Sequence, residues 1–279
     1  MRSGLLLLAA LALAALGADL AVAALGHDPF APDLFNRFAP PSAAHPLGTD
    51  DLGRDVLLRL MQGARVSLAV GLAAALAATL LGTAAGLLAA WRGGWVDAAL
   101  MRLADGLLAL PALPLLVILA ALDPAAIGLP RGEALADILR LAALLALFGW
   151  VGVARLVRAA ALSVLARDHV HAARALGMTE ARILRRHVLP QLAAPVAIAT
   201  ALAVGGAILA ESTLSFLGLG IAPPAASWGN MLANAQELAF NAPLAALWPG
   251  LAIALAVLAC NRLADALAAG RRSGGAPGA

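Results

Sequence analysis

Six long apolar runs, separated by shorter polar segments, dominate the hydrophobic pattern of this chain. A helix needs about twenty apolar residues to cross a hydrocarbon core. The pattern therefore predicts an all-α membrane protein with six transmembrane helices. The predicted spans are Leu5 to Leu25, Val66 to Ala90, a kinked span ending at Leu122, Leu141 to Ala154, Leu192 to Ala210, and Leu244 to Cys260.

The first run has two interpretations. Arg2 and the stretch from Leu5 to Leu16 are typical of the first two regions of a cleaved signal peptide. The apolar character continues to Leu25, however, so we favour an uncleaved first helix.

The polar segments divide the chain into four parts. We expect an N-terminal transmembrane helix in 1–26 and an extracytoplasmic segment with an amphipathic helix in 27–65. A five-helix core in 66–266 includes a loop at 163–190, and 267–279 form a disordered cytoplasmic tail. In the second part, Thr49 is the predicted helix cap, Asp55 and Arg59 form an i,i+4 pair, and Gly63 ends the helix.

Two further features concern the second and third spans. Gly82 and Gly86 have the spacing that lets two helices approach closely. Pro111 and Pro114 should kink the third span. The charged residues at the start of that span are expected to pair with one another: Asp97, Arg102 and Asp105.

Composition supports a membrane protein and removes several other classes. The chain has 62% hydrophobic and 13% charged residues, far from the average of soluble domains. All nineteen basic residues are arginine, so the phosphate-binding loop, which needs lysine, is absent. The arginines are scattered among the spans rather than clustered with stacking aromatics, which argues against nucleic acid. The single cysteine, Cys260, provides no disulfide or cysteine metal site.

The arginines also predict an orientation. If both termini, the Trp91 turn and the loop around His171 share one side, that side carries thirteen arginines and the other carries six. The positive-inside rule then places both termini and this loop in the cytoplasm.

The stretch from Arg167 to Pro190 is the most polar part of the core. Val170, Ala173 and Leu176 should share one face of a first short helix. Gly177 can adopt the left-handed conformation that ends it, and Thr179 can cap a second helix running to about Val188. The pattern predicts a helix, a turn and a helix in water.

A second unusual stretch follows the fifth span. Glu211 to Asn230 is apolar but rich in glycine and proline, so it cannot be one continuous helix. Irregular backbone at membrane depth must be buried in protein or line a wet cavity. Glu211 should lie at the outer end of the span, packed against protein.

Three motifs give the chain a family resemblance. The polar loop resembles the Glu-Ala-Ala, three residues, Gly loop of ABC-importer permeases through Ala172, Ala173, Gly177, Val188, Leu189 and Pro190. His45 to Leu60, HPLGTDDLGRDVLLRL, and LSFLGLG followed by PP and SWG resemble dipeptide, oligopeptide and nickel permeases. His171 stands at the usual Glu position, and Asp168 could supply the carboxylate instead.

The resemblance implies a permease subunit in the bacterial cytoplasmic (inner) membrane, without catalytic residues, metal or cofactor. Its implied partners are a second homologous permease, two ATPase subunits, an extracytoplasmic binding protein and membrane lipid. Peptides are the expected cargo and nickel is the alternative. The implied coupling residues are Asp168, His171, Ala172, Ala173, Gly177, Leu189 and Pro190. The implied translocation path or gate comprises Glu211, Ser215, Phe216, Gly218 and Gly220.

Two other classes remain open at this point. A secondary transporter or channel could use Glu211 and the broken segment as an ion site, and would work without ATPase partners. A scaffold that only assembles a complex would leave the broken segment without a purpose.

Overall fold

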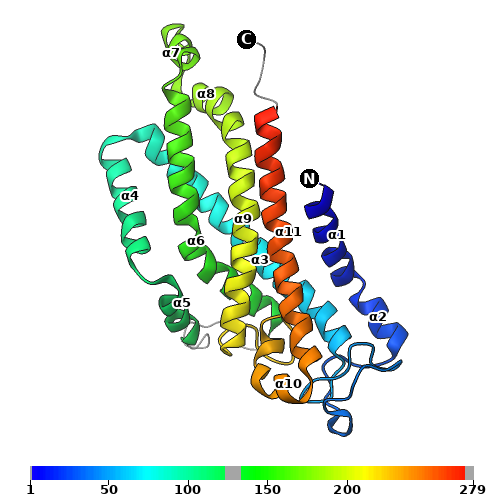
Figure 1. Ribbon diagram of the computed structural model, residues 1–279. Helices are drawn as coiled ribbons and strands as arrows, with labels where there is room; N and C mark the ends of the chain where they lie inside the picture. The colour runs from blue at the N-terminus through cyan, green and yellow to red at the C-terminus, as the bar shows by residue number, and fades with distance from the viewer. Residues whose placement is uncertain (1, 123–132, 274–279) are drawn as a thin grey trace.

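The computed structural model describes residues 2–122 and 133–273, and within these ranges the chain is helical, without a β-strand. Figure 1 shows an elongated bundle in which α7 and α8 project at one end, with the last residues of α11 near them. α10 and the loop before α3 lie at the other end. These are called below the α7 end and the α10 end.

Four helices are long and apolar enough to cross a membrane, and two bent helix pairs pass the same test together. The number is six if each bent pair is one span, which agrees with the sequence pattern. The four long helices are α3 (Val56–Arg92), α6 (Ala134–Leu165), the α8 to α9 helix (Glu180–Phe216) and α11 (Pro243–Ser273). The bent pairs are α1 (Arg2–Leu16) with α2 (Ala18–Leu25), and α4 (Gly94–Ala109) with α5 (Ala112–Ala121).

The predicted close approach at Gly82 and Gly86 is confirmed, and it lies between α3 and α6. A Cβ atom on Gly86 would overlap the carbonyl oxygen of Ala154, and one on Gly82 would sit 2.5 Å from that of Trp150. The absence of side chains at these two positions therefore sets how closely the helices pack.

The boundaries expected for the outer amphipathic helix were wrong. Thr49 caps no helix, because its hydroxyl donates to the carbonyl of Asn36 at 2.5 Å. Asp55 is the cap instead, accepting from the amide of Leu58 at 2.9 Å, and α3 continues from Val56 to Arg92. Gly63 does not end the helix but gives room to Trp228, whose Cδ1 would lie 3.3 Å from a Cβ there.

The third span bends by 85° between α4 and α5, at Leu110 and Pro111, as the prolines predicted. The expected pairing within α4 was wrong. Asp97 instead accepts a two-pronged contact from Arg158, and Asp105 lies 3.6 Å from Arg155. Both arginines are on α6, which runs antiparallel beside α4 (Figure 1).

The remaining boundaries also differ from the expected ones. α6 begins at Ala134, seven residues before the predicted span, and the polar stretch 123–132 before it lies outside the described residues. α11 continues to Ser273, so residues 267–273 of the expected tail are helical. Residues 274–279 lie outside the described part.

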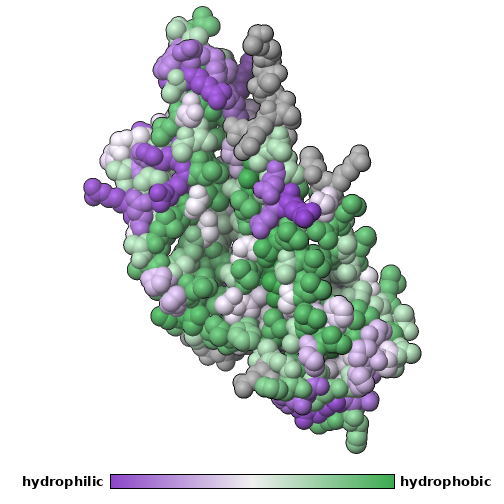
Figure 2. All heavy atoms as spheres, viewed as in Figure 1, coloured by the Kyte–Doolittle hydropathy of each residue, from purple (hydrophilic) through white to green (hydrophobic). Residues whose placement is uncertain are grey.

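Apolar side chains cover the middle of the bundle, and hydrophilic ones gather toward the ends and along the α4 edge (Figure 2). Large side chains such as Leu80 of α3 and Leu202 of α9 are exposed along these membrane-crossing helices. Exposed leucines are expected where the surrounding medium is lipid. The fold thus has the surface of a protein that crosses a membrane.

Candidate functional site

A helical loop projects from the α7 end and is held by one buried face. α7 (Asp168–Ala175) packs Val170 and Ala173 into a core that also contains Ile183 and Val188. Leu176, expected on the same face, is 88% exposed instead. The loop is therefore fixed to the bundle on one side and leaves the other side free in this chain.

The exposed side of the loop carries the sequence-predicted residues Asp168, His171 and Ala172. Gly177 has φ +79°, as predicted, and a Cβ there would meet no atom within 4 Å. Thr179 occupies the cap position of α8 (Glu180–Ile183), but its side chain makes no capping bond.

An ion pair braces this exposed turn. Arg174 donates to Glu180 at 2.7 and 3.1 Å, linking α7 to the start of α8. The hydrogen bonds from Arg174 to the Glu180 carboxylate raise the pKa of the arginine above its usual value. The turn therefore keeps its shape while its outer surface stays accessible.

The second helix of the loop does not stop before Pro190. α8 continues through the π-helical turn η3 (Leu184–Val188) into α9 (Leu189–Phe216). Pro190 follows this π-helical turn almost directly, and it has no amide hydrogen to donate to the preceding turn. Leu189 and Pro190 are both exposed.

At the other end, Glu211 lies inside the protein. Its exposed fraction is 0%, and α9 continues past it to Phe216 rather than ending there. Ser67 of α3 and Ser212 donate to Oε2 at 3.0 and 3.4 Å, while Ser215 donates to Oε1 at 2.7 Å. Hydroxyl donors thus compensate a carboxyl group buried away from water.

Two of these serines connect Glu211 to the irregular segment that follows α9. The amide of Trp228 donates to Ser67 Oγ at 3.1 Å, and the amide of Ile221 donates to Ser215 Oγ at 3.1 Å. Each hydroxyl accepts a hydrogen bond from the segment and donates one to Glu211. We call Glu211, Ser67, Ser212 and Ser215 the serine ring.

Close backbone contacts complete the folded segment. A Cβ on Gly220 would overlap Ser215 Oγ, so only glycine fits there. Gly218 has φ +76° and reverses the chain just after α9. Phe216 and Gly218 are exposed, whereas Ser215 and Gly220 are buried.

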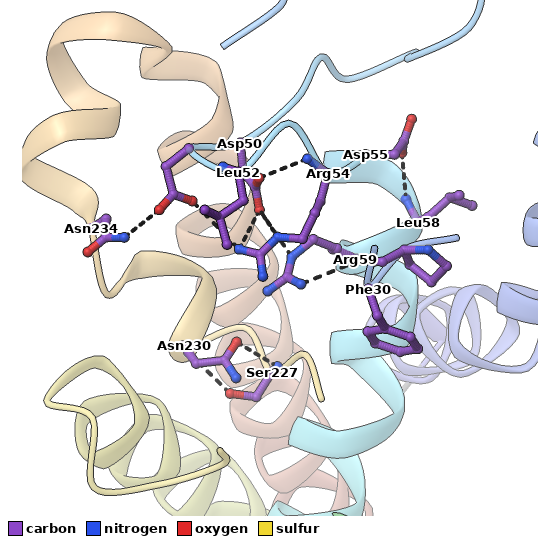
Figure 3. Close-up of polar contacts among 12 residues, drawn as sticks. Phe30, Asp50, Leu52, Arg54, Asp55, Leu58, Arg59, Ser227, Asn230 and Asn234 are labelled. Carbon is purple, nitrogen blue, oxygen red and sulfur yellow. Dashed lines mark hydrogen bonds and ion pairs between the residues drawn. The ribbon is translucent and has the colours of Figure 1, made fainter. Parts of the chain in front are cut away.

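The loop before α3 and the segment that follows α9 form a polar network near the α10 end (Figure 3). Asp50 pairs with Arg54 at 2.8 Å and with Arg59 at 3.3 Å, although Arg59 is only 4% exposed. Asn234 donates to the Asp51 carboxylate at 2.5 Å. This network joins two segments that lie more than 180 residues apart in the chain.

Only some residues of the serine ring and its contacts could be identified from the sequence. Glu211 and Ser215 were identified, but Ser67, Ser212 and Trp228 were missed. A serine in an apolar run is an ordinary packing residue in most helices, so Ser67 gave no signal until its contact with α9 was known.

Asp55 does not pair with Arg59 as expected but lies 3.0 Å from His45 Nδ1.

The fold and these two regions are those of a multi-pass helical membrane protein. A helical loop projects at one end, and a segment folds back onto the bundle at the other. The family described as binding-protein-dependent transport system inner membrane component matches residues 82–270. The chain belongs to this family of inner-membrane transport permeases, and the expected fold class and ABC-permease type are confirmed.

Several relatives match most of the chain. A putative peptide transport system permease protein of Brucella suis is 40% identical over 267 residues, covering 95% of this chain and 85% of the relative. The dipeptide transport system permease protein of Alkalihalophilus pseudofirmus is 36% identical, covering 83% and 73%. The glutathione transport system permease protein of Pectobacterium atrosepticum is 36% identical, covering 81% and 72%.

Proposed function

We propose that this chain is a permease subunit of an ABC importer that moves peptides into the cytoplasm. The relatives compared above carry peptide, dipeptide or glutathione in their names, which favours peptide cargo over nickel. The projecting loop carries this proposal, because a helix-turn-helix with one fixed face and one free face is suited to dock another protein.

In this proposal the α7 end and both termini lie in the cytoplasm, and the loop receives the motion of two ATPase subunits. Asp168, His171, Ala172 and Gly177 form the contact surface, while Ala173 anchors the loop from inside. Leu189 and Pro190 begin the helix that carries the motion into the membrane. Closure and reopening of the ATPases then act as a rigid-body switch.

At the outer side, Glu211, Ser215 and Gly220 hold the folded segment in place. Their burial supports a positioning role, and Phe216 and Gly218 are the candidates for contact with the path because they are exposed. A second, similar permease completes the path, and an extracytoplasmic binding protein delivers the cargo.

The test is reconstitution of the permease with its second permease, ATPases and binding protein in lipid vesicles. We expect ATP-dependent uptake of a labelled tripeptide that requires the binding protein. Uptake of nickel but not of peptide would replace the proposed cargo. Uptake without ATPases would contradict the importer class and favour a secondary transporter.

A further inference from the structure

An ion pair between Asp105 of α4 and Arg155 of α6 is exposed, although both helices belong to the membrane-crossing bundle. The Asp105 carboxylate lies 3.6 Å from the Arg155 guanidinium. Their side chains are 64% and 55% exposed, in contrast to the more enclosed pair of Asp97 and Arg158. Figure 2 shows hydrophilic surface over the upper part of α4, below the projecting loop.

The position of Asp105 along α4 gives its depth. Trp91 and Trp95 flank the turn between α3 and α4, and Trp95 is 81% exposed, as expected for a tryptophan at the membrane interface. Asp105 follows Trp95 by ten residues, which corresponds to roughly 15 Å of helix rise. The hydrocarbon core is about 30 Å thick. Asp105 therefore lies within the hydrocarbon core.

The charges on α6 place Arg155 below the membrane surface as well. Arg140 and Arg155 enclose the uncharged run 141–154, and its fourteen residues rise only about 21 Å. This run is about 9 Å shorter than the hydrocarbon core, so the Cα atom of at least one flanking arginine lies inside the core, and its guanidinium reaches toward the interface. Arg140 is partly buried and donates to the carbonyls of Leu219 and Gly220 at the α10 end. Arg155 is the exposed one.

An exposed charged pair at this depth cannot face lipid, because ionised groups among acyl chains cost several kcal/mol. Ionisable residues inside membrane proteins face the bundle interior or a water-filled cavity. Arg102 lies one turn before Asp105 on the same face of α4 and is also exposed. This face of α4 therefore needs water beside it.

We propose that Asp105 and Arg155 line the water-filled translocation path within the membrane, on the face of α4 that also carries Arg102. This inference rests on the proposed function. The pair holds opposite charges close together, so it presents little net potential to a passing peptide.

The first test is the reactivity of introduced cysteines in the assembled importer. The parent protein carries Cys260→Ala and must take up a labelled tripeptide; failure of that uptake would count against peptide cargo, independently of the labelling result. Asp105→Cys and Ala109→Cys, one turn apart on the same face, should react with an impermeant thiol reagent. Leu103→Cys is the matched control, because Leu103 is apolar, 56% exposed and points to the opposite side of α4.

Thiols react as thiolates in water, so we expect the two path variants to react at least roughly tenfold faster than the control. Equal, slow reaction of all three positions would overturn the inference. Labelling of Asp105→Cys in the isolated permease but not in the assembled importer would also overturn it, because the face would then be a contact between subunits.

The second test separates a path residue from a brace between helices. Asp105→Asn alone leaves Arg155 uncompensated in the path, and uptake should fall by roughly tenfold. The double variant Asp105→Asn with Arg155→Gln removes both charges and should restore most of the uptake. If the pair only braced α4 against α6, the double variant would be impaired as much as the single one, which would overturn the inference.

Discussion

The Ser67 hydroxyl of α3 donates to Glu211 of α9 at 3.0 Å while it accepts the amide of Trp228 at 3.1 Å. One small side chain thereby links a membrane helix, a buried carboxyl group and the folded segment beyond α9. Removing it affects all three.

Ser67→Ala should destabilise the protein by about 1–3 kcal/mol, because the buried amide of Trp228 and one carboxyl oxygen lose a partner. The measurement is thermal unfolding in detergent. Thr213→Ala is the control, since within the described part of the chain the Thr213 hydroxyl donates only to the Leu209 carbonyl of its own helix. Equal melting of the two variants would contradict the role of the ring.

Glu211→Gln tests the same ring through its acceptor. The serine hydroxyls donate to both carboxyl oxygens, whereas an amide presents two hydrogens to one side of the ring. We expect a loosened outer segment and reduced peptide uptake by the reconstituted importer. A variant that assembles and transports normally would leave Glu211 without the proposed role.

Gly86→Ala should prevent the close approach of α3 and α6, because the added Cβ would overlap the Ala154 carbonyl oxygen. Overpacking of this kind costs typically about 1–3 kcal/mol. The control is Gly152→Ala on α6, where a Cβ would meet no atom within 4 Å. In thermal unfolding, Gly86→Ala should melt at a lower temperature than Gly152→Ala.

Gly177→Val should uncouple ATP hydrolysis from transport, because Gly177 has φ +79° and a β-branched residue is strained in that conformation. Gly177→Asn is the control, since asparagine tolerates this conformation better.

His171→Glu should be tolerated if docking depends on shape and apolar contact. If the ATPase instead holds protonated His171 with a carboxylate, the Glu variant should weaken assembly. ATPase activity and uptake of reconstituted complexes decide each case, and normal coupling by Gly177→Val would remove the loop from the mechanism.

The orientation can be tested with cysteines at Ser163 and Ser42, which are both exposed. In vesicles sealed right side out, Ser42→Cys should react with an impermeant thiol reagent and Ser163→Cys should not. The native Cys260 is 1% exposed and should contribute little background. The reverse pattern would place the α7 end outside.

The spans and the loop could be predicted because their signals are local. Apolar runs of sufficient length, Gly177 at a turn and Pro111 in a span depend on residues close in sequence. The partners of charged residues could not be predicted in this way. Asp97 and Asp105 had possible partners within α4, but the antiparallel packing of α6 brings Arg158 and Arg155 nearer.

The start of α3 illustrates the same limit. Thr49 and Asp55 are both good helix caps by residue type. Contacts with residues of the preceding loop decide between them, because the Thr49 hydroxyl donates to Asn36 and accepts from the amide of Ala39. Gly63 was expected to end the helix, yet it provides space for an indole that comes from a distant part of the chain, at Trp228.

The uninterrupted helix from Glu180 to Phe216 has a mechanical consequence. Its 37 residues extend from the projecting loop to the serine ring, a length of about 55 Å. A tilt of only a few degrees at the loop would move the far end by several ångströms, without any relay of side chains between them. A rigid helix of this length therefore transmits a tilt directly from one end of the bundle to the other. Its π-helical turn at Leu184–Val188 departs from regular α-helical geometry.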